Sequence, residues 1–194
     1  MRLSLAAALA LALAARAVPA DDEVAVGQPA PAFSLKTLNP EVARSAWIAL
    51  DRYVGDEAAD PGAKLVVISF FASWCVPCQK ELPALEQLHR TYADQGLRVL
   101  GVDVDREEAG IAAARKLLEA HRVTYPVLSD RFNLLARRYL GAQAPLPSLF
   151  VVRRDGTVAR IERGYAKDVS AVLLAEIQGG LGLRAQAAKA GARP

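Results

Sequence analysis

The pattern of hydrophobic and polar positions predicts strands and helices in alternation from residue 65 onward. Residues 65–71 are a continuous apolar, β-branched run, which is typical of a buried central strand. Residues 75–92 carry leucines and a tyrosine at helical spacing, and residues 97–104 form a second apolar strand. Pro83 lies inside the predicted helix, but the apolar periodicity continues beyond it, so we expect a kink and not an end.

The second half of the chain completes the prediction. We expect a helix from the cap Asp105–Glu108 to about His121, a short extended piece at 125–128 and a helix at 130–139. Strands at 148–153 and 157–163 should follow around the turn Arg154-Asp155-Gly156, and the last element should be an amphipathic helix at 167–177. This order of elements predicts an α/β sandwich with a mixed sheet.

The first twenty residues have the pattern of a secretory signal peptide. Arg2 provides the positive n-region, residues 3–15 are almost entirely Leu and Ala, and small residues precede two candidate cleavage positions, after Ala17 and after Ala20. Arg16 interrupts the apolar run before it reaches the ~20 residues that a spanning helix needs. We therefore predict an exported, periplasmic protein, soluble after cleavage, with a signal peptide at 1–20, one domain at 21–178 and a disordered tail at 179–194.

The charge distribution argues against a polyanionic partner. The whole chain has a net charge of +3, but the basic excess lies in the N-terminal segment and in the last sixteen residues. Residues 21–178 contain 19 Lys and Arg against 21 Asp and Glu. A domain without net positive charge has little attraction for a phosphate backbone, so nucleic acid is not an expected partner.

The chain has two cysteines, Cys75 and Cys78, separated by two residues. A structural disulfide across this spacing closes almost no loop and would stabilise the fold little. A zinc site would need further ligands, yet His89 and His121 have no zinc-finger spacing and are expected at solvated helix positions. Residue 79 is Gln, which excludes haem attachment through Cys-x-x-Cys-His. A redox-active dithiol remains, with no metal and no bound cofactor.

The local pattern assigns unequal roles to the two sulfurs. Cys75 falls at a helix N-terminus, where free backbone N–H groups and the helix dipole favour a thiolate. Cys78 lies one turn in, where we expect more burial, so an exposed Cys75 thiolate would attack and Cys78 would resolve the mixed disulfide. Glu81 follows on the same helix face, either as a buried carboxylate that takes the proton of Cys78 or as an exposed residue that only complements the helix dipole.

The stretch FFASWCVPCQKELPALEQL resembles the active site of the thioredoxin superfamily, and within it the exported TlpA/ResA-like thiol–disulfide oxidoreductases. The similarity extends from Gly27 to about Gln178 and includes Pro147 and the later Arg-Asp-Gly turn. The resemblance implies a thioredoxin-like three-layer sandwich, with a mixed central sheet flanked by helices and extra strands at the N-terminus.

The same resemblance implies roles for individual residues. Cys75 would attack, Cys78 would resolve, and Glu81 matches an acidic residue that this branch places after its second cysteine. Pro147 would be a cis-proline that faces the dithiol, with the backbone of Leu146 pairing with substrate like an added strand. Local sequence alone leaves the isomer of this proline open. The other residues expected to contact substrate are Trp74, Val76 and Pro77.

Two features depart from the family pattern. Ser69 stands where cytoplasmic thioredoxins have a buried Asp, so proton transfer would depend on Glu81. Residues 39–63 are longer than the family norm. They are consistent with a short helix capped at 39–41 or an extra strand at 47–50, followed by a loop without chemistry at 56–62.

The resulting hypothesis is a periplasmic thiol–disulfide oxidoreductase that reduces disulfides of exported proteins. The dipeptide Val76-Pro77 lacks a charge or a His that would stabilise the Cys75 thiolate, which disfavours a strongly oxidising pair. The resemblance adds apocytochrome c or a metal-site assembly protein as clients and a membrane thiol reductant as electron donor. The alternatives are a disulfide oxidase or isomerase of the same fold, a metal or haem chaperone, and a peroxiredoxin, whose positioning side chains are absent at Ala72 and Ile68.

Overall fold

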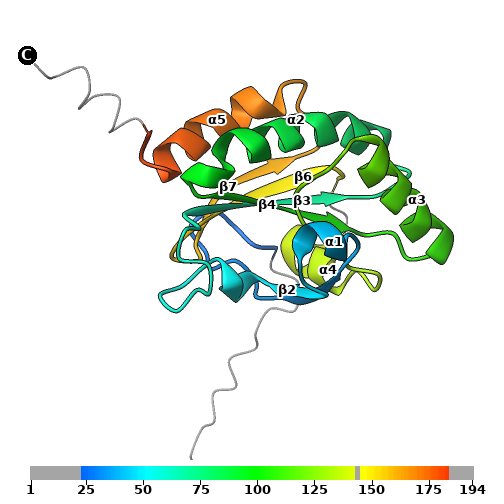
Figure 1. The fold of residues 1–194 in the computed structure, drawn as a ribbon, viewed down its shortest axis with the longest axis horizontal. Coiled ribbons are helices and arrows are strands. Elements are labelled where there is room, and N and C mark those ends of the chain that lie inside the picture. Colours follow the sequence, from blue (N-terminus) through cyan, green and yellow to red (C-terminus); the bar gives the residue numbers. More distant parts are fainter. Residues whose placement is uncertain (1–22, 143–144, 184–194) are drawn as a thin grey trace, which may run out of the picture.

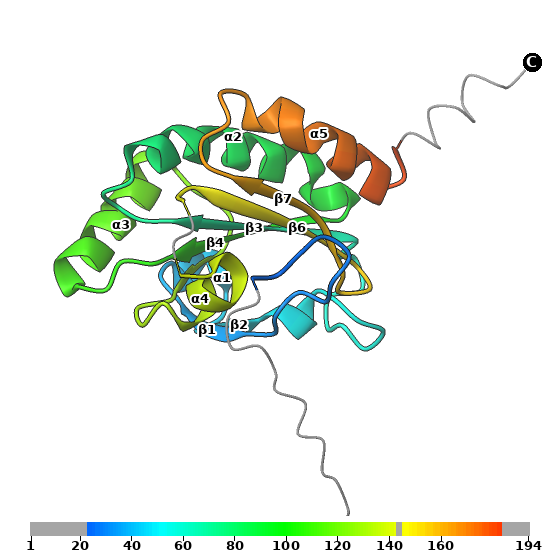
Figure 2. The same ribbon diagram turned by 180° about the vertical axis from the view of Figure 1, so that it is seen from behind.

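The computed structural model describes residues 23–142 and 145–183. Within these ranges one mixed sheet lies between two layers of helices (Figure 1, and from behind in Figure 2). The strands are β1 (Ser34–Thr37), β2 (Trp47–Ala49), β3 (Leu65–Phe71), β4 (Leu97–Asp103), β5 (Val127–Ser129), β6 (Ser148–Arg153) and β7 (Val158–Arg163). The helices are α1 (Pro40–Ala43), α2 (Val76–Tyr92), α3 (Glu108–Ala120), α4 (Leu134–Leu140) and α5 (Val169–Gly180), with 3-10 turns at Leu50–Arg52 and Ala93–Gln95.

The strand order across the sheet is β2-β1-β5-β4-β3-β6-β7. The three central strands β5, β4 and β3 are parallel to one another. On one side, β1 is antiparallel to β5; on the other side, β6 is antiparallel to both β3 and β7. The predicted mixed sheet with helices on both faces is therefore confirmed. The expected extra strands at the N-terminus are β1 and β2, which pair with each other and extend the sheet beyond β5.

Alternate residues of β3 divide the hydrophobic core between the two faces of the sheet. Leu65 and Val67 belong to the cluster under α2, α3 and α5, and Val66 and Ile68 belong to the cluster on the side of α4. Since both faces are covered, every residue of β3 is buried, which is what its continuous apolar run predicts. Pro83 lies inside α2, and the helix continues beyond it to Tyr92.

Both alternatives for residues 39–63 occur together. The short helix α1 begins after Asn39, and β2 forms at 47–49. The loop that follows is held by Arg154 of the β6–β7 turn, whose Nη1 donates hydrogen bonds at 2.8–3.2 Å to the backbone carbonyls of Tyr53, Asp60 and Ala63. These hydrogen bonds attach the insertion to the β6–β7 hairpin and not to the redox site.

Several boundaries differ from the prediction. The helix α4 begins at Leu134 because the side chain of Asp130 caps it from outside, accepting from the N–H of Leu134 at 3.0 Å and of Ala136 at 2.7 Å. The helix α5 continues to Gly180, and Leu181 is buried in the core. The predicted start of a disordered tail at 179 is therefore wrong for residues 179–183. The predicted signal peptide at 1–20 and the tail from 184 lie outside the described residues.

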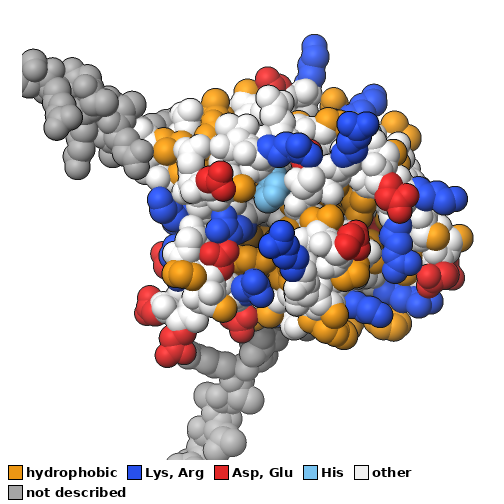
Figure 3. Space-filling view, in the orientation of Figure 1, with side chains coloured by type: hydrophobic (Ala, Val, Ile, Leu, Met, Phe, Trp, Pro, Cys, Tyr) orange, Lys and Arg blue, Asp and Glu red, His pale blue; other side chains and the backbone are white. Residues whose placement is uncertain are grey.

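The face shown in Figure 3 is mixed in charge. Lys and Arg side chains are interspersed with Asp and Glu, and hydrophobic side chains are visible between them. None of the helices in the described ranges has the length and apolar character that crossing a bilayer requires.

Candidate active site

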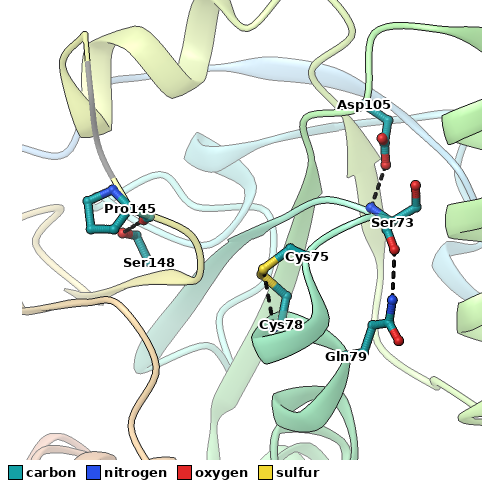
Figure 4. The surroundings of a disulfide bond; sticks show 7 residues. All are labelled: Ser73, Cys75, Cys78, Gln79, Asp105, Pro145 and Ser148. Atoms are coloured by element: carbon teal, nitrogen blue, oxygen red, sulfur yellow. Dashed lines mark hydrogen bonds between the residues drawn. A yellow bond between two sulfur atoms is a disulfide. The ribbon is translucent and has the colours of Figure 1, made fainter.

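Cys75 and Cys78 form a disulfide at the start of α2 (Figure 4). Cys75 is the N-cap residue, with an extended backbone, and the helix begins at Val76. The backbone N–H of Cys78 donates to Cys75 Sγ at 3.2 Å. A sulfur in this position receives a hydrogen bond and the positive end of the helix dipole, which in the reduced protein favours a thiolate at Cys75.

Burial separates the two cysteines less than the sequence predicts. Cys75 is 4 % exposed and Cys78 is 2 % exposed. The exposed surface comes instead from the residues beside Cys75, since Trp74 is 69 % and Val76 58 % exposed and Pro77 is also exposed. The exposed thiolate predicted at Cys75 concerns the reduced protein and stays a prediction, whereas in the disulfide form Cys75 is buried.

The turn before Cys75 is held on both sides of Ser73 (Figure 4). The N–H of Ser73 donates to Asp105 Oδ2 at 2.6 Å, and its C=O accepts from Gln79 Nε2 at 2.8 Å. The N–H of Cys75 itself donates to the carbonyl of Ala72 at 3.1 Å. The turn that presents the redox pair is therefore attached both to the loop after β4 and to α2.

A pair of buried aspartates lies behind this turn, and the sequence analysis missed it. Asp103 is 0 % exposed, and its Oδ1 accepts from the N–H of Asp105 at 3.3 Å. Its Oδ2 has no hydrogen-bond partner within the described residues. Desolvation, with a smaller contribution from Asp105, raises the pKa of Asp103 to about 8. The sequence did offer a signal for this pair, because Asp103 is a charged residue near the end of the apolar run 97–104, where both faces of the strand are expected to be buried.

The predicted cap Asp105–Glu108 contains the N-cap residue of α3, which is Glu107, but no side chain makes a capping hydrogen bond there. The carboxylate of Asp105 is directed to Ser73 instead, and α3 packs closely against it at Gly110, where a Cβ would lie 2.6 Å from Asp105 Oδ1. Only a glycine allows this approach, so the packing of α3 fixes the orientation of Asp105.

We expect Asp105→Ala to loosen the turn before Cys75. The N–H of Ser73 would lose its partner in a half-buried position, at a cost of about 1 to 3 kcal/mol in the free energy of unfolding. Asp105→Asn keeps an oxygen acceptor at the same place and should retain most of the stability and the reaction rate of Cys75 with a disulfide. Urea unfolding and the rate of that reaction measure both effects. Wild-type stability and rate in Asp105→Ala would show that the hydrogen bond to Ser73 is dispensable.

Glu81 is a buried residue of α2, three positions after Cys78. It is 2 % exposed, and neither carboxyl oxygen makes a hydrogen bond of normal geometry within the described residues. Desolvation raises the pKa of Glu81 to about 7, and the backbone amide of Ala166 opposes this shift only in part. Of the two interpretations of Glu81, the structure selects the buried carboxyl over the exposed residue that complements the helix dipole.

The burial of Glu81 predicts that the oxidised protein loses stability as the pH rises. The pKa of Glu81 is about 7 in the folded protein and near 4.5 when unperturbed, so the folded state binds more protons between these values. The contribution of Glu81 to the free energy of unfolding is largest below about pH 4.5 and is lost as the pH rises through about 7. Between these two limits the free energy of unfolding falls by about 3 kcal/mol. Asp103, whose pKa is about 8, also lowers the free energy of unfolding as the pH rises through that value.

This effect is measured by urea unfolding of the oxidised wild type and Glu81→Gln at about pH 5 and about pH 8. The wild type should lose more stability over this interval than the variant, by up to about 3 kcal/mol. An identical loss in the two proteins would show that Glu81 is not buried in its neutral form.

The segment before β6 lies across from the disulfide. In Figure 4, Pro145 and Ser148 lie to one side of the Cys75–Cys78 bond, and Ser148 Oγ donates to the carbonyl of Pro145 at 2.7 Å. The peptide bond Leu146–Pro147 between them is cis, as the resemblance implies. Pro147 is buried, its carbonyl accepts from the N–H of Gly164 at 2.8 Å, and Leu146 is half-buried.

One of the two histidines is half-buried and only partly solvated. His89 packs edge-to-face on Tyr125, with ring centroids 5.9 Å apart, and burial lowers the pKa of His89. The neighbouring Glu86 is buried as well and accepts hydrogen bonds from the N–H and Oγ1 of Thr124. Among the described residues, no group of three or more His, Cys, Asp or Glu is arranged to hold a metal ion.

Comparison with known proteins adds independent information. The pattern of the AhpC/TSA family matches residues 26–161. The chain is 31 % identical over 162 residues to the thiol-disulfide oxidoreductase ResA of Geobacillus thermodenitrificans, covering 84 % of this chain and 83 % of the relative. It is 30 % identical over 138 residues to the thioredoxin-like protein YneN of Bacillus subtilis, covering 71 % of each. A crystal structure of a thiol:disulfide interchange protein from Chlorobium tepidum shares the fold, with a TM-score of 0.61 at 23 % identity over 81 % of this chain and 99 % of that one.

Two relatives that align over most of the chain, both named ResA, are called thiol-disulfide oxidoreductases, which is the chemistry that a Cys75–Cys78 pair at a helix N-terminus can perform. The chain therefore belongs to the AhpC/TSA family and is a thiol–disulfide oxidoreductase with a thioredoxin-like fold.

Proposed function

We propose that this oxidoreductase is an exported reductant that passes electrons from the Cys75–Cys78 dithiol to disulfides of client proteins. The observation that carries the direction is the environment of Cys75 Sγ. Within the described residues it accepts a hydrogen bond from one donor, the N–H of Cys78, and no cationic side chain supplies another. A strongly oxidising pair requires extra stabilisation of its reduced form, so this site favours reduction of clients.

The proposed reaction has two exchange steps. The Cys75 thiolate attacks one sulfur of the client disulfide, which breaks that bond, forms a Cys75–client disulfide and releases the other client sulfur as a thiolate. Cys78 then attacks Cys75 Sγ, closes the Cys75–Cys78 bond and releases the second client sulfur. Glu81 takes the proton of Cys78, and the client thiolates take protons from solvent. Two electrons have then moved from the dithiol to the client.

Client contact is proposed on both sides of the disulfide. Trp74, Val76 and Pro77 offer exposed apolar surface beside Cys75. On the other side, an extended client segment would pair with the backbone of Leu146, next to the cis bond to Pro147, in the manner of an added strand.

The compartment and the partners belong to the same proposal. The signal-peptide pattern at 1–20 supports export to the periplasm. An exported reductant consumes its dithiol at each turnover, so a membrane thiol reductant must restore it. Apocytochrome c or a metal-site assembly protein is proposed as client on the resemblance to TlpA/ResA-like proteins. Cell fractionation and N-terminal sequencing test export, with a mature start after Ala17 or Ala20 expected.

The reduction potential of the Cys75–Cys78 pair tests the direction. We expect a midpoint near the thioredoxin value of about −270 mV when the protein is equilibrated with dithiothreitol or glutathione. A midpoint near about −120 mV would overturn the proposal in favour of an oxidase or isomerase. A protein without any redox transition would be a binding module, such as a metal or haem chaperone.

A further inference from the structure

A groove beside the disulfide combines apolar walls with two arginines. Its volume is about 350 Å³, and its described lining includes Trp74, Val104, Arg106, Arg137, Leu140 and Leu146. Trp74 directly precedes Cys75, and Leu146 directly precedes Pro147. The groove therefore begins at Trp74, the residue before Cys75, and extends over the loop after β4 and along α4.

Arg106 is oriented toward this groove by a fixed neighbour. Its Nε donates to Asn133 Oδ1 at 2.8 Å, and within the described part of the chain no hydrogen bond occupies the two terminal nitrogens of the guanidinium. Asn133 is itself held, because its Nδ2 donates to the carbonyls of Val104 at 2.9 Å and Asp130 at 3.0 Å. The orientation of Arg106 is thus set before any client arrives.

The positive charge of the groove is not compensated. The described residues that line it include no Asp or Glu. No carboxylate of the described residues forms an ion pair with Arg106 or Arg137, whereas Arg131 nearby pairs with Glu108 at 3.8 Å. Guanidinium groups bind carboxylates through paired, charge-assisted hydrogen bonds, so a carboxylate is the chemical group that this groove fits.

We propose that the groove selects clients by charge, by binding an acidic side chain close to the cysteine that Cys75 attacks. Arg106 and Arg137 pair with the carboxylate, while Trp74 and Leu140 contact the apolar part of the client segment. The inference rests on the proposed reduction of client disulfides and adds the class of client sequence. Charge complementarity of this kind raises the rate of encounter and sets the preference among partners.

The test uses disulfide-linked dimers of short peptides that differ in the residue after cysteine, which is Glu, Gln or Lys. Each reaction oxidises one Cys75–Cys78 dithiol of the reduced protein and yields two peptide thiols, whose release is followed in time. At about 0.02 M salt we expect the Glu peptide to react about fivefold faster than the Lys peptide. The ratio should approach one at about 0.5 M salt, where exposed charges are screened within a few ångströms.

Two variants and a control locate the effect. Arg137→Glu should reverse the preference in favour of the Lys peptide, and Arg106→Gln should reduce the ratio to about twofold. Lys116→Glu makes the same change of charge on the exposed side of α3, outside the groove, and should keep the wild-type ratio. If all peptides react at one rate, or if Arg137→Glu leaves the ratio unchanged, the charge selection is wrong and the reductant function stands. If no peptide is reduced, the proposed function fails as well.

Discussion

Cys78→Ser is expected to stop turnover while leaving the first step of the reaction intact. In this variant Cys75 keeps its N-cap position, and the N–H of residue 78 still reaches its sulfur. The attack on a client disulfide therefore proceeds, but no second thiol releases the client. Insulin reduction should fall to background, and a mixed disulfide should accumulate to about one equivalent per protein, measured by non-reducing electrophoresis and mass spectrometry.

Cys75→Ser is the matched control. The remaining thiol of Cys78 lies inside the first turn of α2 and not at the N-cap, so it lacks the free N–H groups and the dipole end that favour a thiolate at Cys75. This variant should lose turnover and should also form no mixed disulfide. Accumulation of the mixed disulfide in Cys75→Ser, and not in Cys78→Ser, would reverse the two roles.

Glu81→Gln is expected to slow the second exchange step by about 10- to 100-fold. The pKa of Glu81, about 7, is close to working pH, where a carboxyl accepts and returns a proton most effectively. Gln has a similar shape but cannot take the proton of Cys78. Rapid-quench measurement should show a mixed disulfide that forms at the wild-type rate and resolves slowly. The pH profile of resolution should also lose its ionisation near 7.

Glu86→Gln offers a control on the same helix. Glu86 is also a buried carboxyl of α2, but it bonds to Thr124 and Arg90. Its replacement should lower the free energy of unfolding, because the hydrogen bonds of a charged acceptor are lost, and should leave the pH profile of resolution unchanged. The same ionisation near 7 in wild type and Glu81→Gln would remove Glu81 from proton transfer.

Much of the fold is encoded in local patterns and could be predicted from them. A strand covered on both faces requires apolar residues at every position, and β3 has them. The position of Cys75 at the helix start follows from the change of periodicity after residue 71. The start of α3 at Glu108 falls within the predicted cap Asp105–Glu108, but the hydrogen bond of Asp105 to Ser73 could not be foreseen. The start of α4 was less predictable, because Asp130 caps this helix from four residues before it.

The functional details depend on contacts between segments that are distant in the chain. Ser73 and Asp105 are 32 residues apart, and the turn that presents Cys75 depends on their hydrogen bond. The groove brings Trp74, Arg106 and Arg137 together from three different segments. Spacing along one helix could place Glu81 below Cys78, but it could not show what covers Glu81.

The sequence by itself determined the order of strands and helices from residue 65 onward, the mixed sheet and the redox pair at the start of α2, because these depend on periodicity and on the identity of near neighbours. Only the tertiary structure decided that Glu81 and Asp103 are buried carboxyls with raised pKa values and that Cys75 is covered in its disulfide form. The physical reason is that desolvation depends on every segment that packs around a group, and most of those segments are far away in the sequence.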